Sequence, residues 1–189
     1  LTIATWNINS VRLRIGNVER YLKLRKPDVL CLQETKSPDE FFPHAAFERL
    51  GYVHRLVQGM KAYNGVAIVS KVPFKAMNVH HRCGKEDCRH IEAALDVGGD
   101  PILLDNLYIP AGGDIPDPDL NVKFAHKLDF YREMADWYAA RKPRPRARKG
   151  LRRIMVGDLN VAPLEHDVWS HKQLLKIVSH TPVEVELFG

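Results

Sequence analysis

The side chains best suited to chemistry in this sequence follow apolar runs that are typical of buried strands. Four such runs end in an amide, a carboxylate or a phenol, at Asn7, Glu34, Tyr108 and Asp158, and Asn160 comes two residues after the last. In α/β folds, ligands bind where the ends of several strands converge. Carboxylate and amide oxygens without a matching set of histidines or cysteines suit Mg²⁺ or Mn²⁺. Each residue alone could be a turn former or a solvated charge, but four strand ends of this kind favour a divalent-metal site.

The sharpest of these segments is Gly157-Asp158-Leu159-Asn160. Glycine allows the backbone to approach a ligand closely. Asp158 and Asn160 stand at positions i and i+2, so they project to the same side of an extended chain. The pattern therefore predicts a ligand site at this strand end.

Hydrophobic patterns predict the elements that must position these residues. Strands are expected at residues 1–7, 28–34, 52–58, 65–70, 74–80, 90–97, 101–109 and 153–159, and helices at 14–26 and 121–141. Five of the strands follow one another without a helix, so most must be antiparallel neighbours. Two capping boxes with proline at the first helical position, Ser37-Pro38-Asp39-Glu40 and Thr181-Pro182-Val183-Glu184, are expected to begin further helices. These patterns favour an α/β fold with mixed sheets at the centre and helices outside.

Length and composition favour one soluble globular domain over residues 1–189. No apolar run approaches the roughly 18 residues of a membrane span and no signal peptide is evident, so we expect no membrane partner. Three cysteines, an odd number, fit a reducing compartment, and we expect a cytoplasmic monomer. The sequence has no Gly-x-x-x-x-Gly-Lys loop, Gly-x-Ser-x-Gly elbow or His-Glu-x-x-His motif, which argues against NTPases, serine hydrolases and zinc proteases.

The net charge of +5 comes from one segment. Eight of the thirteen residues from Arg141 to Arg153 are basic and none is acidic, whereas the rest of the chain has 20 basic and 23 acidic residues. This segment could clamp the phosphates of a polyanion, or it could be a solvated loop between a helix and a strand. Both interpretations stay open.

The polar strand ends also carry a resemblance to a known family. Four motifs occur in its order and at its rough spacing: Trp6-Asn7-Ile8-Asn9-Ser10, Leu32-Gln33-Glu34-Thr35-Lys36, Tyr108-Ile109-Pro110 and Gly157-Asp158-Leu159-Asn160. They resemble the exonuclease III family of DNA-repair nucleases, which includes exodeoxyribonuclease III and the apurinic/apyrimidinic endonucleases, in the endonuclease/exonuclease/phosphatase superfamily. The resemblance implies a four-layered α/β sandwich with two central mixed, largely antiparallel sheets and outer helices. It also implies Mg²⁺- or Mn²⁺-dependent hydrolysis of phosphodiesters in duplex DNA, at abasic sites or 3′ ends.

The same resemblance implies roles for single residues. Glu34 would be a principal metal ligand with Asn7 beside it, and Asp158, near the metal, would orient or deprotonate the attacking water. Asn160 would be a further residue of the metal site and would hold the scissile phosphate or the transition state. Tyr108 would face the phosphate with its hydroxyl. A cation at the metal site would neutralise charge on the phosphoryl oxygens, and a neighbouring carboxylate could accept the proton of the water.

Contacts with DNA are expected from fewer positions. Arg89 resembles a family position near the DNA backbone. Lys123 and Lys127 open the long helix, and they could contact DNA or simply flank its apolar face.

The chain departs from the family pattern in two places. Ala111 stands where the family usually has an amide residue, so one substrate contact is missing. No Ser-Asp-His motif is present, although its histidine serves the family as proton acceptor or transition-state stabiliser. We therefore expect the chain to lack the C-terminal part of the family's domain and to have little or no activity by itself. Ser170-His171 and Ser179-His180 precede the place of that motif and are expected at the surface.

Two other functions stay open. The chain could be another hydrolase of the superfamily, a phosphatase or phosphodiesterase, or an inactive fragment that binds nucleic acid through the basic segment. A cluster of possible zinc ligands lacks the two tight pairs of known zinc fingers and is expected to be a hairpin tip; it comprises His80, His81, Cys83, Cys88 and His90.

Overall fold

The computed structural model describes residues 1–141 and 152–189, which form two compact units. The first unit contains residues 1–81, 85–108 and 152–158, and the second contains residues 82–84, 109–141 and 159–189. Most of the basic segment between Arg141 and Arg153 lies outside the described residues.

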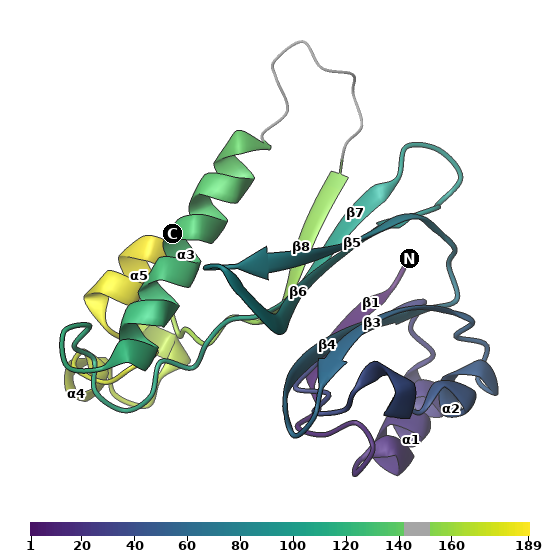
Figure 1. The fold of residues 1–189 in the computed structure, drawn as a ribbon, viewed down its shortest axis with the longest axis horizontal. Helices are drawn as coiled ribbons and strands as arrows, with labels where there is room; N and C mark the ends of the chain where they lie inside the picture. The colour runs from purple at the N-terminus through teal and green to yellow at the C-terminus, as the bar shows by residue number, and fades with distance from the viewer. Residues whose placement is uncertain (142–151) are drawn as a thin grey trace. The chain divides into compact units, whose positions relative to one another are not determined.

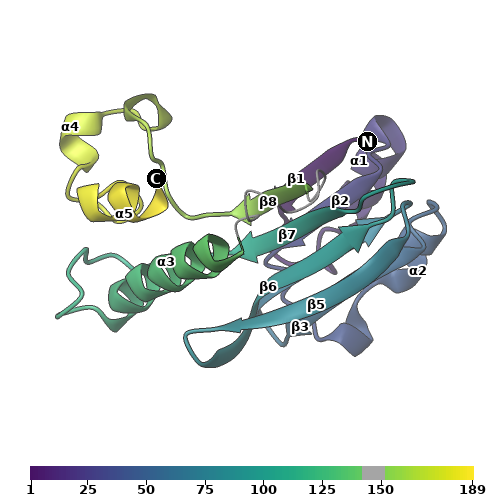
Figure 2. The same ribbon diagram turned by 90° about the horizontal axis from the view of Figure 1, so that it is seen from above.

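Two four-stranded sheets make up most of the first unit (Figures 1 and 2). One sheet has the order β1 (Ile3–Asn7), β2 (Val29–Gln33), β4 (Tyr63–Ser70) and β3 (His54–Met60). The other has the order β5 (Phe74–Arg82), β6 (Lys85–Leu95), β7 (Ile102–Tyr108) and β8 (Arg152–Asp158). The β1–β2 and β7–β8 pairs are parallel, whereas β4 is antiparallel to β2 and β3, and β6 is antiparallel to β7. The predicted α/β fold with two mixed sheets is confirmed.

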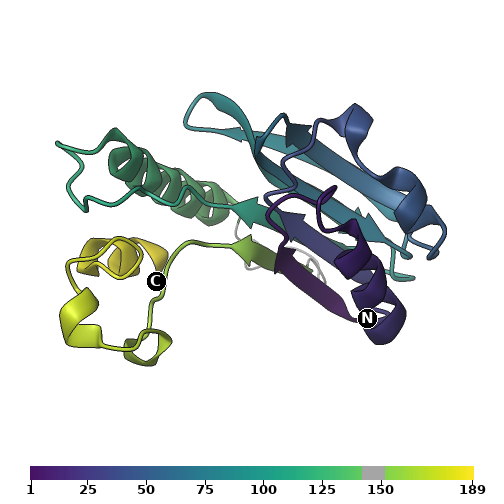
Figure 3. The same cartoon turned by 90° about the horizontal axis from the view of Figure 1, so that it is seen from below.

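Strand β2 shows why this unit is layered. Its five residues are all buried, because Leu30 and Leu32 pack toward α1 (Ile15–Arg25) and α2 (His44–Glu48) while Val29 and Cys31 pack toward the second sheet. Figure 3 shows the two helices on the outer face of the first sheet. Successive side chains of a strand point to opposite faces, so one continuous apolar run supplies two cores.

The prediction of one helix that begins after Ser37 was wrong. The structure has a short 3-10 helix, Asp39–Phe41, and then the separate α2. Phe42, which precedes Pro43, is extended at φ −65° and ψ 136°, because a proline disfavours the helical conformation in the residue before it. The Ser37 hydroxyl donates to the carbonyl of Pro38, 3.2 Å away, and caps nothing.

In the second unit, the long helix α3 (Val122–Ala140) lies beside α5 (Pro182–Phe188), as Figure 1 shows. The side chain of Asn121 caps α3 by accepting from the backbone N–H of Lys123. The capping box expected at Thr181 and Glu184 is present and begins α5. Two short elements between β8 and α5 had not been expected: a 3-10 helix, Glu165–Asp167, and α4 (His171–Leu174).

In the part of the chain that the structure describes, no helix is long and apolar enough to cross a membrane. All three cysteines lie in that part, and each is a free thiol.

Candidate active site

Two parallel strand pairs bring the predicted site residues of the first unit to the carboxyl ends of the strands. In the β1–β2 pair Asn7 lies opposite Gln33, so Glu34 follows directly beside Asn7. In the β7–β8 pair Tyr108 lies opposite Asp158. Parallel strands end at the same edge of their sheet, which is why this pattern could be recognised in the sequence.

One amide joins these strand ends. The Asn7 Nδ2 donates to Glu34 Oε1 at 2.8 Å and to Asp158 Oδ2 at 2.7 Å. The Asn7 Oδ1 accepts from the backbone N–H of Asn9 at 3.1 Å. The three contacts agree on the orientation of the amide, because a carboxylate accepts and an N–H donates. Asn7 therefore holds the two carboxylates of the first unit's site in fixed positions.

Glu34 is prepared to carry a negative charge. Partial burial by itself raises the pKa of Glu34, but hydrogen bonds from Asn7, Lys36 and Tyr108 together with the charge of Lys36 outweigh it and hold the pKa below its ordinary value. The ion pair joins Lys36 Nζ to Glu34 Oε2 at 2.8 Å. The backbone of Glu34 is in the left-handed region at φ 52°, a strained conformation that recurs at functional sites.

Tyr108 is held in its protonated form. Burial is the main cause that raises its pKa, followed by the charge of Glu34 and by the hydrogen bond that the hydroxyl donates to Glu34. Arg89 stacks on the ring of Tyr108, with the guanidinium carbon 4.8 Å from the ring centroid, and its Nη1 donates to the Tyr108 carbonyl at 3.1 Å. Arg89 is only 6% exposed and is ion-paired with Asp87 at 2.6 Å. The structure therefore places Arg89 against Tyr108, and its contact with DNA stays a prediction.

The donor set of this site fits a hard divalent cation. Two carboxylates share one amide donor, and the charge of Lys36 offsets only one of them. Mg²⁺ is usually bound by one or two carboxylates and retains several waters. Among the described residues, no group of three or more His, Cys, Asp or Glu side chains is placed to hold a metal ion.

The glycine before Asp158 has a different role from the expected one. A Cβ at position 157 would lie 2.0 Å from the carbonyl oxygen of Leu107, and the backbone of Gly157 has φ 148°. The close approach predicted for a ligand is therefore an approach of the neighbouring strand β7. Glycine at this position allows the β7–β8 pair to form next to Asp158.

A buried amide pair beneath these strand ends had not been recognised in the sequence. Gln33 Nε2 donates to Thr5 Oγ1 at 2.9 Å and to Asn106 Oδ1 at 2.7 Å. The Nδ2 of Asn106, on β7, donates to the carbonyls of Leu32 at 3.0 Å and Ala67 at 2.9 Å. The pair ties the second sheet to the first directly below Glu34. The only signal in the sequence was a polar side chain inside each apolar run.

The remaining candidates lie in the second unit. Asn160 donates from Nδ2 to the carbonyl of Ile109 at 2.7 Å. Lys123 is exposed in the first turn of α3, where its backbone N–H is capped by Asn121.

Lys127 is fully buried, so the structure supports neither a contact with DNA nor a place beside the apolar face of α3. His180 is 4% exposed, which makes its expected surface position wrong, and it bonds the carbonyl of Ala162 through Nδ1 at 2.6 Å.

The possible zinc ligands lie on a strand hairpin, but the expected solvated tip was wrong for His90, which is buried within β6 (Lys85–Leu95). Strands β5 and β6 meet at Cys83 and Gly84. His90 is buried and its Nε2 lies 3.0 Å from Asp105 Oδ1, with the ring of His80 packed against it at 4.6 Å between centroids. This arrangement is a structural network between strands.

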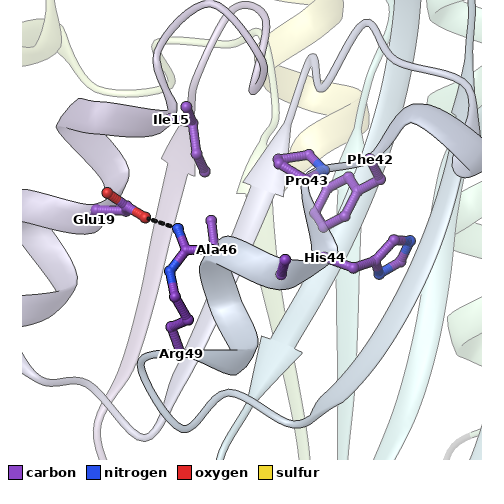
Figure 4. A pocket seen from close by; sticks show the side chains of 8 residues that line it. Ile15, Glu19, Phe42, Pro43, His44, Ala46 and Arg49 are labelled. Atoms are coloured by element: carbon purple, nitrogen blue, oxygen red, sulfur yellow. Dashed lines mark hydrogen bonds and ion pairs between the residues drawn. The ribbon is translucent and has the colours of Figure 1, made fainter.

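A shallow depression of about 530 Å³ lies between α1 and α2 (Figure 4). It is lined mainly by apolar side chains and by the Glu19–Arg49 ion pair, whose N–O distance is 2.9 Å. None of the predicted site residues lines it.

Comparison with known proteins agrees with these observations. Residues 4–178 match the Endonuclease/Exonuclease/phosphatase family. Exodeoxyribonuclease III of Haemophilus influenzae is 30% identical over 166 residues, which are 87% of this chain and 59% of that protein. The chain thus spans less than two thirds of this curated relative.

Two solved structures are similar over the whole chain. An AP endonuclease from Archaeoglobus fulgidus has 34% identity and a TM-score of 0.83, with 68% of its chain covered. The 3′ phosphatase NExo from Neisseria, bound to a product DNA hairpin, has 27% identity and a TM-score of 0.85, also with 68% covered. The chain therefore belongs to the endonuclease/exonuclease/phosphatase family, in the branch of exonuclease III and the AP endonucleases.

Proposed function

We propose that the protein is a metal-dependent DNA-repair nuclease that hydrolyses phosphodiester bonds of duplex DNA, at abasic sites or at 3′ ends. The observation that carries this proposal is the Asn7 amide that holds Glu34 and Asp158 together at converging strand ends. Family membership supports the reaction class, and a relative bound to a DNA hairpin supports DNA as the substrate.

The residues divide the work as follows. Glu34 and Asn7 would hold Mg²⁺ or Mn²⁺ through their oxygens, and Asp158 and Asn160 are proposed as further residues of the metal site. The cation, when bound, would neutralise charge on the phosphoryl oxygens and lower the pKa of a water ligand. Asp158 would orient the attacking water and accept its proton. Tyr108, which stays protonated at neutral pH, would face the phosphate with its hydroxyl, and Asn160 would bind the scissile phosphate.

Further parts of the proposal concern partners and location. Arg89 and Lys123 are proposed DNA contacts. The guanidinium of Arg89 stacks on the ring of Tyr108. The free cysteines agree with a cytoplasmic protein, and we propose that it acts as a monomer.

The decisive experiment replaces Asp158 in the full-length natural protein. Asp158→Ala should reduce Mg²⁺-dependent incision of an abasic duplex by at least about 10²-fold, the usual contribution of a proton acceptor. Asp129→Asn, an exposed carboxylate on α3 whose partner is Arg132, is the matched control and should retain activity. Incision retained by Asp158→Ala would refute the assignment.

A 3′-phosphatase activity is a second candidate, because the Neisseria relative is described as one. The same side chains could hydrolyse a terminal phosphate. Release of inorganic phosphate from a duplex with a 3′-phosphate, measured beside incision of an abasic duplex, separates the phosphatase activity from the nuclease activity.

The protein could instead be a fragment that only binds nucleic acid. DNA binding that weakens with salt, without any turnover that EDTA abolishes, would indicate this function.

A further inference from the structure

Helix α3 carries two buried polar side chains on its packed face. Lys127 has no exposed surface and Tyr131 is 3% exposed. They are four residues apart, so they lie one above the other on the same side of the helix. An ammonium group buried in this way is unfavourable unless it is paired and fully hydrogen-bonded.

The ammonium group of Lys127 meets that condition. It is ion-paired with the buried Glu184 carboxylate and donates to the carbonyl oxygen of Asn160 at 2.6 Å. It also lies 3.2 Å from the carbonyl of Ala111 and 3.2 Å from the hydroxyl of Ser179. Lys127 thus binds the segment after β7 and the segment after β8 at one point.

Tyr131 holds the neighbouring peptide. Its hydroxyl donates to the carbonyl oxygen of Leu159 at 2.6 Å. Two successive turns of α3 therefore bind two successive carbonyls, those of Leu159 and Asn160. A rigid helix placed against the chain in this way fixes the direction of both peptides.

Glu184 is itself fixed by the start of α5. Its carboxylate accepts from the backbone N–H of Ser179 at 2.8 and 3.0 Å and from the hydroxyl of Thr181 at 2.7 Å. The capping box therefore also supplies the counter-ion of Lys127. Glu184 is itself completely buried.

The contacts of Lys127 and Tyr131 require hydrogen-bond donors. A buried ion pair is often replaced by apolar side chains without loss of stability, but apolar side chains cannot bind carbonyl oxygens. Asn160 has a left-handed backbone at φ 51°, a conformation that persists where the surroundings over-determine it. Its own side chain bonds the carbonyl of Ile109 at 2.7 Å.

We propose that Lys127 and Glu184 are positioning residues of the active site. Their ion pair, together with Tyr131, fixes the backbone at Leu159 and Asn160 and so sets the direction in which Asn160 presents its side chain to the phosphate. This inference rests on the proposed nuclease function, since it deepens the role given there to Asn160.

The test uses the full-length natural protein with the variants Lys127→Met, Lys127→Arg and Tyr131→Phe. Lys127→Met should lower kcat for incision of an abasic duplex by about 10²-fold, the effect of misplacing a group by about 1 Å, and leave KM nearly unchanged. Lys127→Arg, which keeps the charge and the donors, should recover part of the loss. Met134→Ala, a buried change on the same helix that removes no donor, should lower the melting temperature but retain kcat.

An NMR measurement tests the inference without measuring turnover. In labelled protein, the side-chain amide resonance of Asn160 should shift and exchange faster in Lys127→Met than in Met134→Ala. If the parent protein shows no nuclease activity, the proposed function fails while this measurement still decides the positioning role.

Two outcomes would overturn the inference. In one, Lys127→Met has a kcat and an Asn160 resonance that match those of the parent protein. In the other, the loss of kcat in Lys127→Met is no larger than the loss in Met134→Ala. If Lys127→Met does not fold, Tyr131→Phe decides: it keeps the ion pair, and a parent-like kcat and Asn160 resonance in it would refute the inference.

Discussion

At the scale of single residues, Asn7 shows how one amide can hold two anions together. Each of its Nδ2 protons serves one carboxylate, Glu34 or Asp158. An aspartate at this position could donate to neither and would add a third negative charge. The Oδ1 atom accepts one hydrogen bond, from Asn9, and a carbonyl oxygen has a second lone pair. Asn7 can therefore bind both carboxylates and still offer an oxygen to a cation.

Tyr108 gives a prediction about pH. The hydroxyl of Tyr108 is one of the groups that hold the pKa of Glu34 below its ordinary value. The charged form of Glu34 is thus present above that lowered pKa and is lost as the pH falls through it. Tyr108→Phe removes one donor, so the pKa of Glu34 in the metal-free protein should rise.

The pKa is measured on the metal-free protein by NMR titration of the Glu34 carboxyl group, with Tyr63→Phe as control. The ring centroid of Tyr63 lies 5.9 Å from the guanidinium carbon of Arg89, but Tyr63 is 57% exposed. A pKa of Glu34 that does not change in Tyr108→Phe would show that the hydroxyl does not support the charge of Glu34.

At the scale of elements, buried polar side chains tie the strands into one arrangement. The Gln33–Asn106 pair links β2 to β7 beneath the site. A second network joins β6, β7 and β8, because Arg153 contacts Glu92 and Asp105 at 2.6 Å each while His90 contacts Asp105 at 3.0 Å. Buried networks of this kind are favourable only when every member is satisfied.

Asp105 should therefore contribute to stability in a pH-dependent way. Burial alone raises the pKa of Asp105, but His90 and Arg153 outweigh it and lower the pKa below its ordinary value. The resulting stability is present above the ordinary pKa of an aspartate and is lost as the pH falls through the lowered value. Asp105→Asn should reduce the free energy of unfolding at pH 7 by about 3 kcal/mol, the usual effect of breaking a buried pair.

Urea unfolding at pH 7 and at acidic pH measures this difference, with the exposed Asp100→Asn as control. The gap between the parent and Asp105→Asn should narrow in acid. An equal gap at both pH values would mean that the charge of Asp105 is not the cause.

At the scale of the whole molecule, the basic charge is concentrated in one stretch of sequence. The segment from Arg141 to Arg153 carries eight basic residues, and the rest of the chain is slightly acidic. Each phosphate contact that a basic side chain makes contributes about 0.9 to the slope of log K against log salt. The slope therefore reports whether this segment contacts DNA.

We expect Arg144→Gln, Arg146→Gln and Arg148→Gln, combined, to reduce that slope by about 2 to 3 for duplex DNA. The control replaces Arg20, Lys23 and Arg25, three exposed residues of α1, by glutamine, so that the net charge changes equally. Equal slopes in the two triple variants would identify the segment as a solvated loop.

The sequence alone was sufficient for the features that depend on local pattern. Apolar runs with polar ends identified Asn7, Glu34, Tyr108 and Asp158 as residues of converging strands, because parallel pairing brings strand ends to the same edge. The capping box at Thr181 and the apolar face of α3 followed from spacing along one helix. The resemblance supplied the site roles that single residues could not.

The rest required contacts between distant parts of the chain. Asn7 and Asp158 are 151 positions apart and share a hydrogen bond, and no local pattern reports such a distance. Lys127 was expected to flank an apolar face or contact DNA, but its counter-ion Glu184 comes from another helix. A charge is stable in a core only where its partners converge on it, so the tertiary structure alone decided that Lys127 is buried and that Asn160 is held beside it.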